Sequence, residues 1–437
     1  MPLNPQKALT NARLLDPATG LDVLGGLLVD GRTITDFGQG LFKDGTPDGA
    51  EVIDCGGHCL IPGLVDIRAH LGEPGHEQKE TLATAGRAAA AGGVTSIVCL
   101  PDTEPAIDDM SGVEFVARRA RKLGLAKVYP YAAVTKNLEG KELAELGMLA
   151  DAGAVAFTDA LNPIADAQLM RRALSYAKTF GLLIAQHPEE PSLSKGSSMN
   201  AGETATRLGL VGNPAEAEVI MVERDIRIVE LTGGRLHFAH LSTAAAINAV
   251  RLAKARGLAI TCDTAPPYFA LNEMAVGDYR TFAKLSPPLR AEADRQAVIE
   301  GLKDGTIDAV ASDHLPQDEE SKRLPFAEAA PGGVGIQSLL AITLELYHNG
   351  HMDLITALDL ITRKSAELMA LPAGRLSKGA AADLTLIDPN RGWKISEKTL
   401  VSKSKNSPFD GRPVQGQALM TVVDGRIIHD VLNIEVR

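Results

Sequence analysis

Residues 66–70, Asp66-Ile67-Arg68-Ala69-His70, are the stretch of this chain with the most chemical information. The apolar residues 60–66 predict a buried strand after a turn, and a His-x-His sequence at its end would hold a divalent metal ion from one strand face. Arg68 stands at the first of those two positions. Its guanidinium offers no lone pair to a metal and carries a fixed positive charge. We therefore expect a site with the frame of a metal centre and altered chemistry.

Five further polar residues stand at the ends of apolar runs, namely His70, Asp159, His187, His240 and Asp313. Histidines, a bridging carboxylate and a late aspartate are the parts of a hydrolytic metal centre. In such a centre the metal lowers the pKa of a bound water and the aspartate, here Asp313, shuttles its proton. A single histidine is more often structural, but five such residues at strand ends favour one shared site.

The elements that must position these residues follow a repeating pattern. Eight apolar runs read as strands of a parallel sheet that is covered on both faces, at residues 64–70, 95–100, 127–134, 154–159, 182–187, 236–240, 259–264 and 309–313. Helical patterns lie between them, for example at 78–91, 214–231, 243–256 and 293–303. Eight such units predict an α/β fold, a (β/α)8 TIM barrel, whose active site lies at the C-terminal ends of the strands.

The two ends of the chain have a different composition. They are rich in valine, isoleucine and Asp-Gly turns, as in Val29-Asp30-Gly31-Arg32 and Val423-Asp424-Gly425-Arg426. We expect one small β-sandwich domain built from both termini, with residues 1–61 and 371–437 in it and residues 62–370 in the barrel.

Composition limits the class of protein. The chain has 437 residues, 45% of them hydrophobic, and a net charge of −11. An acidic balance disfavours nucleic acid and anionic membranes as partners. The N-terminus lacks a charged region followed by an apolar run, and no stretch approaches the ~18 apolar residues of a membrane span. We expect a cytoplasmic protein.

The four cysteines are Cys55, Cys59, Cys99 and Cys262. Cys99 and Cys262 lie inside apolar runs, which favours reduced thiols that pack in the core. The spacing Cys55-x3-Cys59 leaves a zinc site as the lesser alternative, because no second pair of ligands lies nearby.

Nearly the whole chain resembles the dihydroorotases of the amidohydrolase superfamily, of the class I type. The resemblance rests on blocks in the family's order: Pro62-Gly63-Leu64-Val65-Asp66 with His70 and Glu73-Pro74-Gly75, Gly92-Gly93-Val94-Thr95, Ala156-Phe157-Thr158-Asp159, Gln186-His187, Ala239-His240-Leu241-Ser242-Thr243, Pro287-Pro288-Leu289-Arg290, Ser312-Asp313-His314 and Lys405-Asn406-Ser407-Pro408-Phe409. It implies a TIM barrel with a β-sandwich, zinc, and reversible cyclisation of carbamoyl aspartate to dihydroorotate in pyrimidine biosynthesis.

The resemblance also implies a metal set, which is incomplete here. Asp159, His187 and His240 match the bridging acid and the ligands of one metal. His70 and Asp313 match the other metal, whose remaining ligand is replaced by Arg68. We expect at most one zinc ion, or none, and we expect Arg68 to pair with Asp313 or Asp159. The alternative is that Arg68 extends into solvent on its long side chain.

Four positions that contact substrate in the family are changed. Gly72 stands where the family has arginine, Asp102 and Ser286 where it has asparagine, and Gln317 where it has histidine. Dihydroorotate and carbamoyl aspartate are anionic, so the loss of an arginine and the gain of Asp102 weaken their binding.

Three hypotheses follow. The first is a dihydroorotase homologue that has lost catalysis and acts as a structural partner, in a homo- or hetero-oligomer, with aspartate transcarbamoylase as the first candidate because family members assemble with it. The second is an active hydrolase of another cyclic amide, of the hydantoin or dihydropyrimidine type, with one metal at His187, His240 and Asp159. The third is residual dihydroorotase activity.

Overall fold

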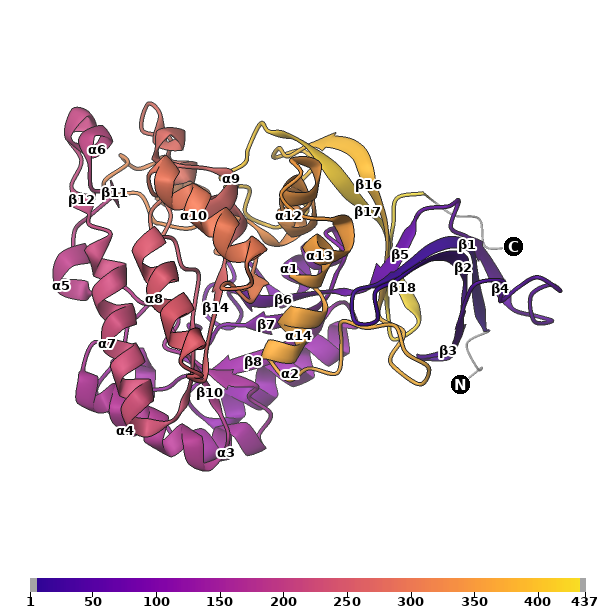
Figure 1. Cartoon of the computed structure of the whole chain (residues 1–437), viewed down its shortest axis with the longest axis horizontal. Coiled ribbons are helices and arrows are strands. Elements are labelled where there is room, and N and C mark those ends of the chain that lie inside the picture. The colour runs from indigo at the N-terminus through magenta and orange to yellow at the C-terminus, as the bar shows by residue number, and fades with distance from the viewer. Residues whose placement is uncertain (1–5, 433–437) are drawn as a thin grey trace.

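The barrel is the larger part of the computed structural model, which describes residues 6–432 (Figure 1). Its eight strands form one sheet in the order β15-β14-β13-β10-β9-β8-β7-β6. Their bounds are β6 Leu64–Ala69, β7 Val94–Cys99, β8 Lys127–Ala132, β9 Ala156–Phe157, β10 Leu183–Gln186, β13 Arg235–Phe238, β14 Ile260–Thr264 and β15 Ala309–Val310. All neighbours are parallel, and a bridge between Ala69 and His314 joins the two ends. The predicted TIM barrel and its eight strands are confirmed.

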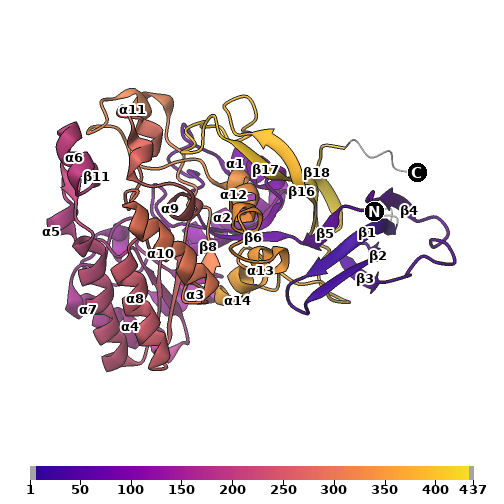
Figure 2. The same ribbon diagram turned by 45° about the horizontal axis from the view of Figure 1, so that its top comes forward.

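Helices cover the outside of this sheet. The longer ones are α1 Leu82–Ala91, α2 Met110–Leu123, α4 Ala167–Thr179, α7 Glu216–Thr232, α8 Ala244–Ala255, α10 Glu292–Lys303 and α12 Leu339–His348. Figure 2 shows α4, α7, α8 and α10 beside one another. The helix predicted from residue 78 begins at Leu82, because the Thr81 side chain caps it by accepting a hydrogen bond from the Thr84 amide.

Shorter elements complete the barrel's loops. They are α3 Leu146–Asp151, α5 Pro191–Ser194, α6 Glu203–Leu208, α9 Pro266–Ala270, α11 Glu319–Arg323, α13 Leu354–Asp359, α14 Arg363–Leu368, the strands β11 Met199–Asn200 and β12 Gly212–Asn213, and the 3-10 turns Lys136–Leu138, Glu273–Val276, Thr281–Ala283 and Ile336–Ser338. Several lie above the C-terminal ends of the barrel strands, where loops carry binding residues.

A second sheet combines both ends of the chain, as predicted. Its strands β1 Lys7–Asp16, β2 Leu21–Asp30, β3 Thr33–Gly38, β4 Glu51–Asp54 and β5 Cys59–Pro62 join β16 Leu384–Lys394, β17 Pro413–Val423 and β18 Arg426–Asp430. The contact between the two ends is the antiparallel pair β5 and β16. The domain boundaries at 61/62 and 370/371 stay a prediction.

The single strand expected at residues 60–66 is wrong. The chain forms β5 in the second sheet and β6 in the barrel, with Gly63 between them. A Cβ at Gly63 would lie 2.1 Å from Thr95 Oγ1. Only glycine therefore lets the chain pass so close to β7 as it changes sheets.

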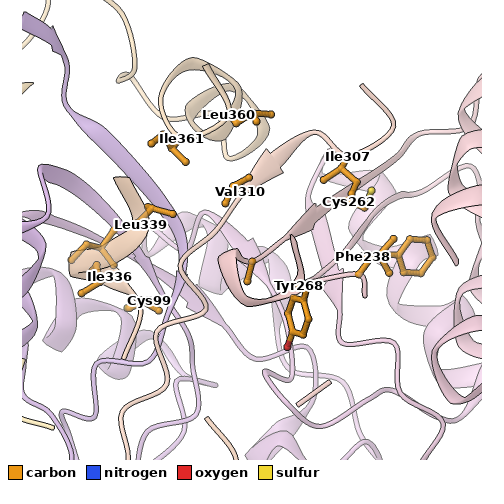
Figure 3. Close-up of a cluster of buried hydrophobic side chains, with 14 of the residues drawn as sticks. Cys99, Phe238, Cys262, Tyr268, Ile307, Val310, Ile336, Leu339, Leu360 and Ile361 are labelled. Carbon is orange, nitrogen blue, oxygen red and sulfur yellow. The ribbon is translucent and has the colours of Figure 1, made fainter. Parts of the chain in front are cut away.

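The core fills the space between the strands and the helices (Figure 3). Phe238, Val310 and Leu360 belong to one buried cluster there. All four cysteines are buried and unpaired, and burial raises the pKa of Cys55 and of Cys99 to about 12. This is the behaviour of thiols that pack rather than react. None of the helices within residues 6–432 has both the length and the apolar character that a bilayer span requires.

Candidate active site

The mouth of the barrel collects the predicted site residues. His70, Asp159, His187, His240 and Asp313 each follow a barrel strand by one to three residues. The first four are buried, and the Asp313 side chain is 10% exposed. His240 and Asp313 have φ values of 41° and 48°. Residues other than glycine rarely adopt that left-handed conformation, and backbone strain of this kind concentrates at functional sites.

Arg68 ends inside this mouth. Its side chain is 1% exposed, and its Nε donates to Asp313 Oδ1 at 3.2 Å. Its Nη2 donates to the Ala160 carbonyl at 3.4 Å. The predicted pairing with Asp313 is confirmed, and the alternative in which Arg68 extends into solvent is wrong.

A continuous row of contacts runs from this ion pair across the mouth. Asp313 Oδ1 lies 3.1 Å from His240 Nδ1, and His240 Nε2 lies 2.7 Å from His187 Nδ1. His187 Nε2 lies 3.4 Å from Glu189 Oε2. We call Arg68, Asp313, His240, His187 and Glu189 the mouth chain.

The protonation state of His240 follows from its surroundings. Burial and the charge of Arg68 lower the pKa of His240 to about 4, although Asp313 acts to raise it. His240 is therefore neutral.

Both carboxylates are held ionised by their neighbours. Burial alone would raise the pKa of Asp313, but the hydrogen bond from His240 and the charge of Arg68 bring it well below its ordinary value. Burial likewise opposes ionisation of Glu189, whereas hydrogen bonds from His187 and Asn213 lower its pKa to about 2. Asn213 Nδ2 donates to Glu189 Oε1 at 2.6 Å.

His70 belongs to a separate pair. Its Nδ1 lies 2.5 Å from Asp102 Oδ2. Burial would raise the pKa of Asp102, but the charge and hydrogen bond of His70 lower it. His70 Nε2 is buried and has no hydrogen-bond partner among the described residues. A carboxylate on one ring nitrogen is how metal-binding histidines are oriented, but no second ligand accompanies His70 because Arg68 is turned to Asp313.

Asp159 does not bridge the histidines. One carboxylate oxygen accepts hydrogen bonds from the Val134 and Thr135 amides, and the other from the Thr135 hydroxyl. Within residues 6–432 it makes no hydrogen bond to His70, His187 or His240. Burial raises its pKa to about 6. Asp159 therefore joins the end of β9 to the end of β8.

These contacts do not fit a zinc ion. Across residues 6–432, no three histidine, cysteine, aspartate or glutamate side chains lie close enough together to hold a metal. Two imidazole nitrogens on one tetrahedral zinc stand about 3.3 Å apart, whereas His187 Nδ1 and His240 Nε2 are 2.7 Å apart. The set of His187, His240 and Asp159 expected for a single metal is not assembled.

The four positions expected to contact substrate serve internal contacts instead. Gly72 has a φ of 69°, and a Cβ there would lie 2.5 Å from the Glu80 carbonyl oxygen. The Ser286 hydroxyl donates to Glu189 at 3.5 Å. Gln317 Nε2 donates to the Pro331 carbonyl. Asp102 is paired with His70, as described above.

The sequence reasoning missed Glu189 and Asn213. Both line a cavity of about 220 Å³ beside the mouth chain, together with Ser197, Ser198 and Lys284. A signal for Glu189 was present, because it follows His187 by two residues at a strand end. Asn213 lies further along the chain, in β12, and nothing in its local sequence marks it as a site residue.

Comparison with known proteins places most of the chain in one family. A family model described as dihydro-orotase-like matches residues 57–246, and a model of the amidohydrolase family matches residues 234–429. The chain is 46% identical to the dihydroorotase of Anaplasma phagocytophilum over 97% of this chain and 95% of that protein. It is 44% identical to the dihydroorotase of Syntrophotalea carbinolica, over 96% of this chain and 98% of that protein.

Among solved structures, the fold matches an L-hydantoinase (dihydropyrimidinase) from Arthrobacter aurescens with a TM-score of 0.86. That match has 23% identity over 97% of this chain and 96% of the other. A D-hydantoinase from Thermus sp. matches with a TM-score of 0.81 and 25% identity, over 97% and 95% of the two chains. The first likeness concerns the fold alone.

Proposed function

Because this chain belongs to the dihydroorotase family of the amidohydrolase superfamily, we propose that it is a member that does not hydrolyse dihydroorotate. It acts instead as the structural partner of another enzyme in the cytoplasm. The first candidate partner is aspartate transcarbamoylase, through the family resemblance and the shared pathway of pyrimidine biosynthesis.

The observation that carries the proposal is the mouth chain. Arg68 provides a fixed positive charge to Asp313, and the facing ring nitrogens of His187 and His240 contact each other. Unit charges at ~4 Å and an effective dielectric of ~20 interact by about 4 kcal/mol, so a dication beside Arg68 would be opposed by on the order of 8 kcal/mol before relaxation. Arg68 thus supplies beside Asp313 a positive charge of the kind that a metal would supply there.

The substrate positions support the same conclusion. An arginine that would pair with a substrate carboxylate is absent, because Gly72 stands there with backbone carbonyls too close for any side chain. Asp102 adds a negative charge and is engaged by His70. An anionic ring therefore meets no matching cation from these positions and is repelled by a carboxylate.

The competing function is hydrolysis of a hydantoin or a dihydropyrimidine with one metal at His187, His240 and Asp159. Its support is the fold shared with hydantoinases. It requires the contact between His187 and His240 to open and Asp159 to leave the Thr135 amide and hydroxyl. Residual dihydroorotase activity requires the same rearrangement.

Two assays separate these functions. The first measures bound zinc and turnover of dihydroorotate and hydantoin by the purified chain with added zinc, beside the Anaplasma relative as positive control. We expect at most one zinc per chain and no turnover, also for Arg68→His, since that change leaves Gly72, Asp102, Ser286 and Gln317 as they are. Turnover of hydantoin would establish the competing function, and robust turnover of dihydroorotate by Arg68→His would contradict our reading of the pocket.

The second assay tests the partner. The chain is co-expressed with the aspartate transcarbamoylase of its own organism and examined by size-exclusion chromatography with light scattering. We expect one complex at micromolar concentrations and higher transcarbamoylase activity or stability than for the partner alone. Separate elution together with unchanged transcarbamoylase activity would rule out this partnership.

A further inference from the structure

Two turns with the same sequence, Val-Asp-Gly-Arg, lie against each other although they come from opposite ends of the chain. One joins β2 to β3 and the other joins β17 to β18. A Cβ at Gly425 would lie 2.1 Å from the Gly31 carbonyl oxygen, so only glycine allows this approach. Ala382 ties the turns together, since its amide donates to the Arg32 carbonyl and its carbonyl accepts from the Gly425 amide.

The packed turns bring Arg32 and Arg426 to one cavity of about 720 Å³. The end of α2, the first residues of β8, and Ala152 and Gly153 form most of the rest of its wall. Cavities of this size hold small organic molecules. The cavity lies at the N-terminal end of β8, opposite the mouth, and joins the barrel to the second sheet.

Three arginines of this cavity have no acidic partner in the described part of the chain. Within residues 6–432, Arg32, Arg121 and Arg426 form no ion pair, and the Arg121 side chain donates only to the Ala117 carbonyl. By contrast, Lys127 is neutralised by Asp383 at 2.7 Å and Asp424 at 2.8 Å. These groups together leave two positive charges in excess, in a chain whose net charge is −11.

All three arginines are exposed, and one of them, Arg426, lies against the end of α2. A Cβ at Gly124, which ends α2 with a φ of 64°, would lie 2.8 Å from Arg426 Nη1, so the guanidinium rests on the helix end. Val423 and Ala120 give the same cavity an apolar wall, and Tyr129 lies at its edge. The cavity thus combines the planar guanidinium groups of arginine with an apolar surface.

We propose that this cavity binds a small organic molecule that carries a phosphate group. A guanidinium matches phosphate oxygens in a bidentate way, and three of them from three separate segments would enclose a multiply charged group. Because the arginines come from both the barrel and the second sheet, binding ties the two together. This site is independent of the function proposed for the mouth.

The test uses the full chain and calorimetric titration with pyrophosphate, phenyl phosphate, inorganic phosphate and citrate at low and at physiological salt. We expect pyrophosphate to bind and to weaken with salt, and phenyl phosphate to bind more tightly than inorganic phosphate because of the apolar wall. Citrate carries comparable charge on carboxylates. Equal binding of citrate would overturn the assignment of a phosphate.

The arginines are tested by Arg32→Gln, Arg121→Gln and Arg426→Gln, singly and together. Each single change should weaken pyrophosphate binding by about tenfold, and the triple variant should lose it. Arg172→Gln, an exposed arginine of α4 outside the cavity, is the matched control and should bind as the wild type does. A rise in the unfolding midpoint with pyrophosphate in the wild type, absent from the triple variant, gives a second readout. No binding by the wild type, or equal loss in the control, would overturn the proposal.

Discussion

At the scale of single residues, Arg68 decides the character of the barrel mouth. It supplies a buried positive charge that cannot be removed by deprotonation, and Asp313 is its partner. Charge replacement of this kind makes the two groups dependent on each other, because either one alone would be a buried, unpaired charge. The Asp313 carboxylate is hydrogen-bonded to His240, and His240 is in turn hydrogen-bonded to His187.

We predict strong coupling between Arg68 and Asp313. Arg68→Met should lower the free energy of unfolding by about 3–5 kcal/mol because it leaves the Asp313 carboxylate buried without its cation. The double variant Arg68→Met/Asp313→Asn should be more stable than the sum of the single effects predicts. Urea unfolding measures both quantities. The exposed pair Arg118 and Glu114 is the matched control, with a coupling below ~0.5 kcal/mol. Strict additivity at Arg68 and Asp313 would refute the ion pair.

Gly72 yields a second prediction at this scale. Gly72→Ala should destabilise the protein by more than the ~1–2 kcal/mol that a left-handed conformation costs alanine, because the new Cβ would also meet the Glu80 carbonyl. Gly257→Ala is the control, since Gly257 has a φ of 77° and no atom near its Cβ position. The difference between the two free energies of unfolding isolates the clash. Equal losses would show that the backbone at residue 72 can relax to accept a side chain.

At the scale of elements, buried hydrogen bonds between neighbouring βα units position the ends of the strands. Glu218 at the start of α7 accepts hydrogen bonds from the amides and hydroxyls of Ser242 and Thr243. These two residues end the short segment between His240 and α8. The hydrogen bonds of Glu218 therefore set where β13 ends and how the His240 ring enters the mouth.

We predict that Glu218→Gln weakens these hydrogen bonds. The new amide NH2 faces hydrogen-bond donors, so at least two hydrogen bonds are lost and the free energy of unfolding falls by about 2–4 kcal/mol. Glu223→Gln, on the exposed face of the same helix, should change it by less than ~0.5 kcal/mol. Thermal and urea unfolding of the two variants make the comparison. Similar stabilities would mean that the Glu218 contacts are dispensable.

At the scale of the whole molecule, the barrel and the second sheet are joined by polar contacts as well as by β5 and β16. Lys127, the first residue of β8, lies between Asp383 and Asp424 of the second sheet. The Thr385 hydroxyl donates to the Gly93 carbonyl at the start of β7. The junction is thus specified by groups that would be unpaired if the two parts separated.

We predict that Lys127→Met weakens this junction. Two neighbouring carboxylates would lose their common cation, which should cost about 2–4 kcal/mol and lower the midpoint of thermal unfolding. Limited proteolysis should also cut the chain faster near residues 381–383. Lys141→Met removes an exposed lysine that pairs with Glu139 and should leave both measurements unchanged. If the two variants behave alike, the Lys127 ion pairs do not hold the junction.

The sequence by itself determined the class of fold, the strand ends that meet at the mouth and the presence of an arginine where a metal ligand is expected. These follow from local apolar patterns and from the chemistry of single residues. Only the tertiary structure decided which partners the polar groups take, since Arg68 and Asp313 are 245 residues apart. The pairs of His187 with His240 and of His70 with Asp102, and the place of Glu189 in the mouth chain, depend on side-chain directions across the barrel. No local pattern encodes those directions, because they are set by packing from every strand at once.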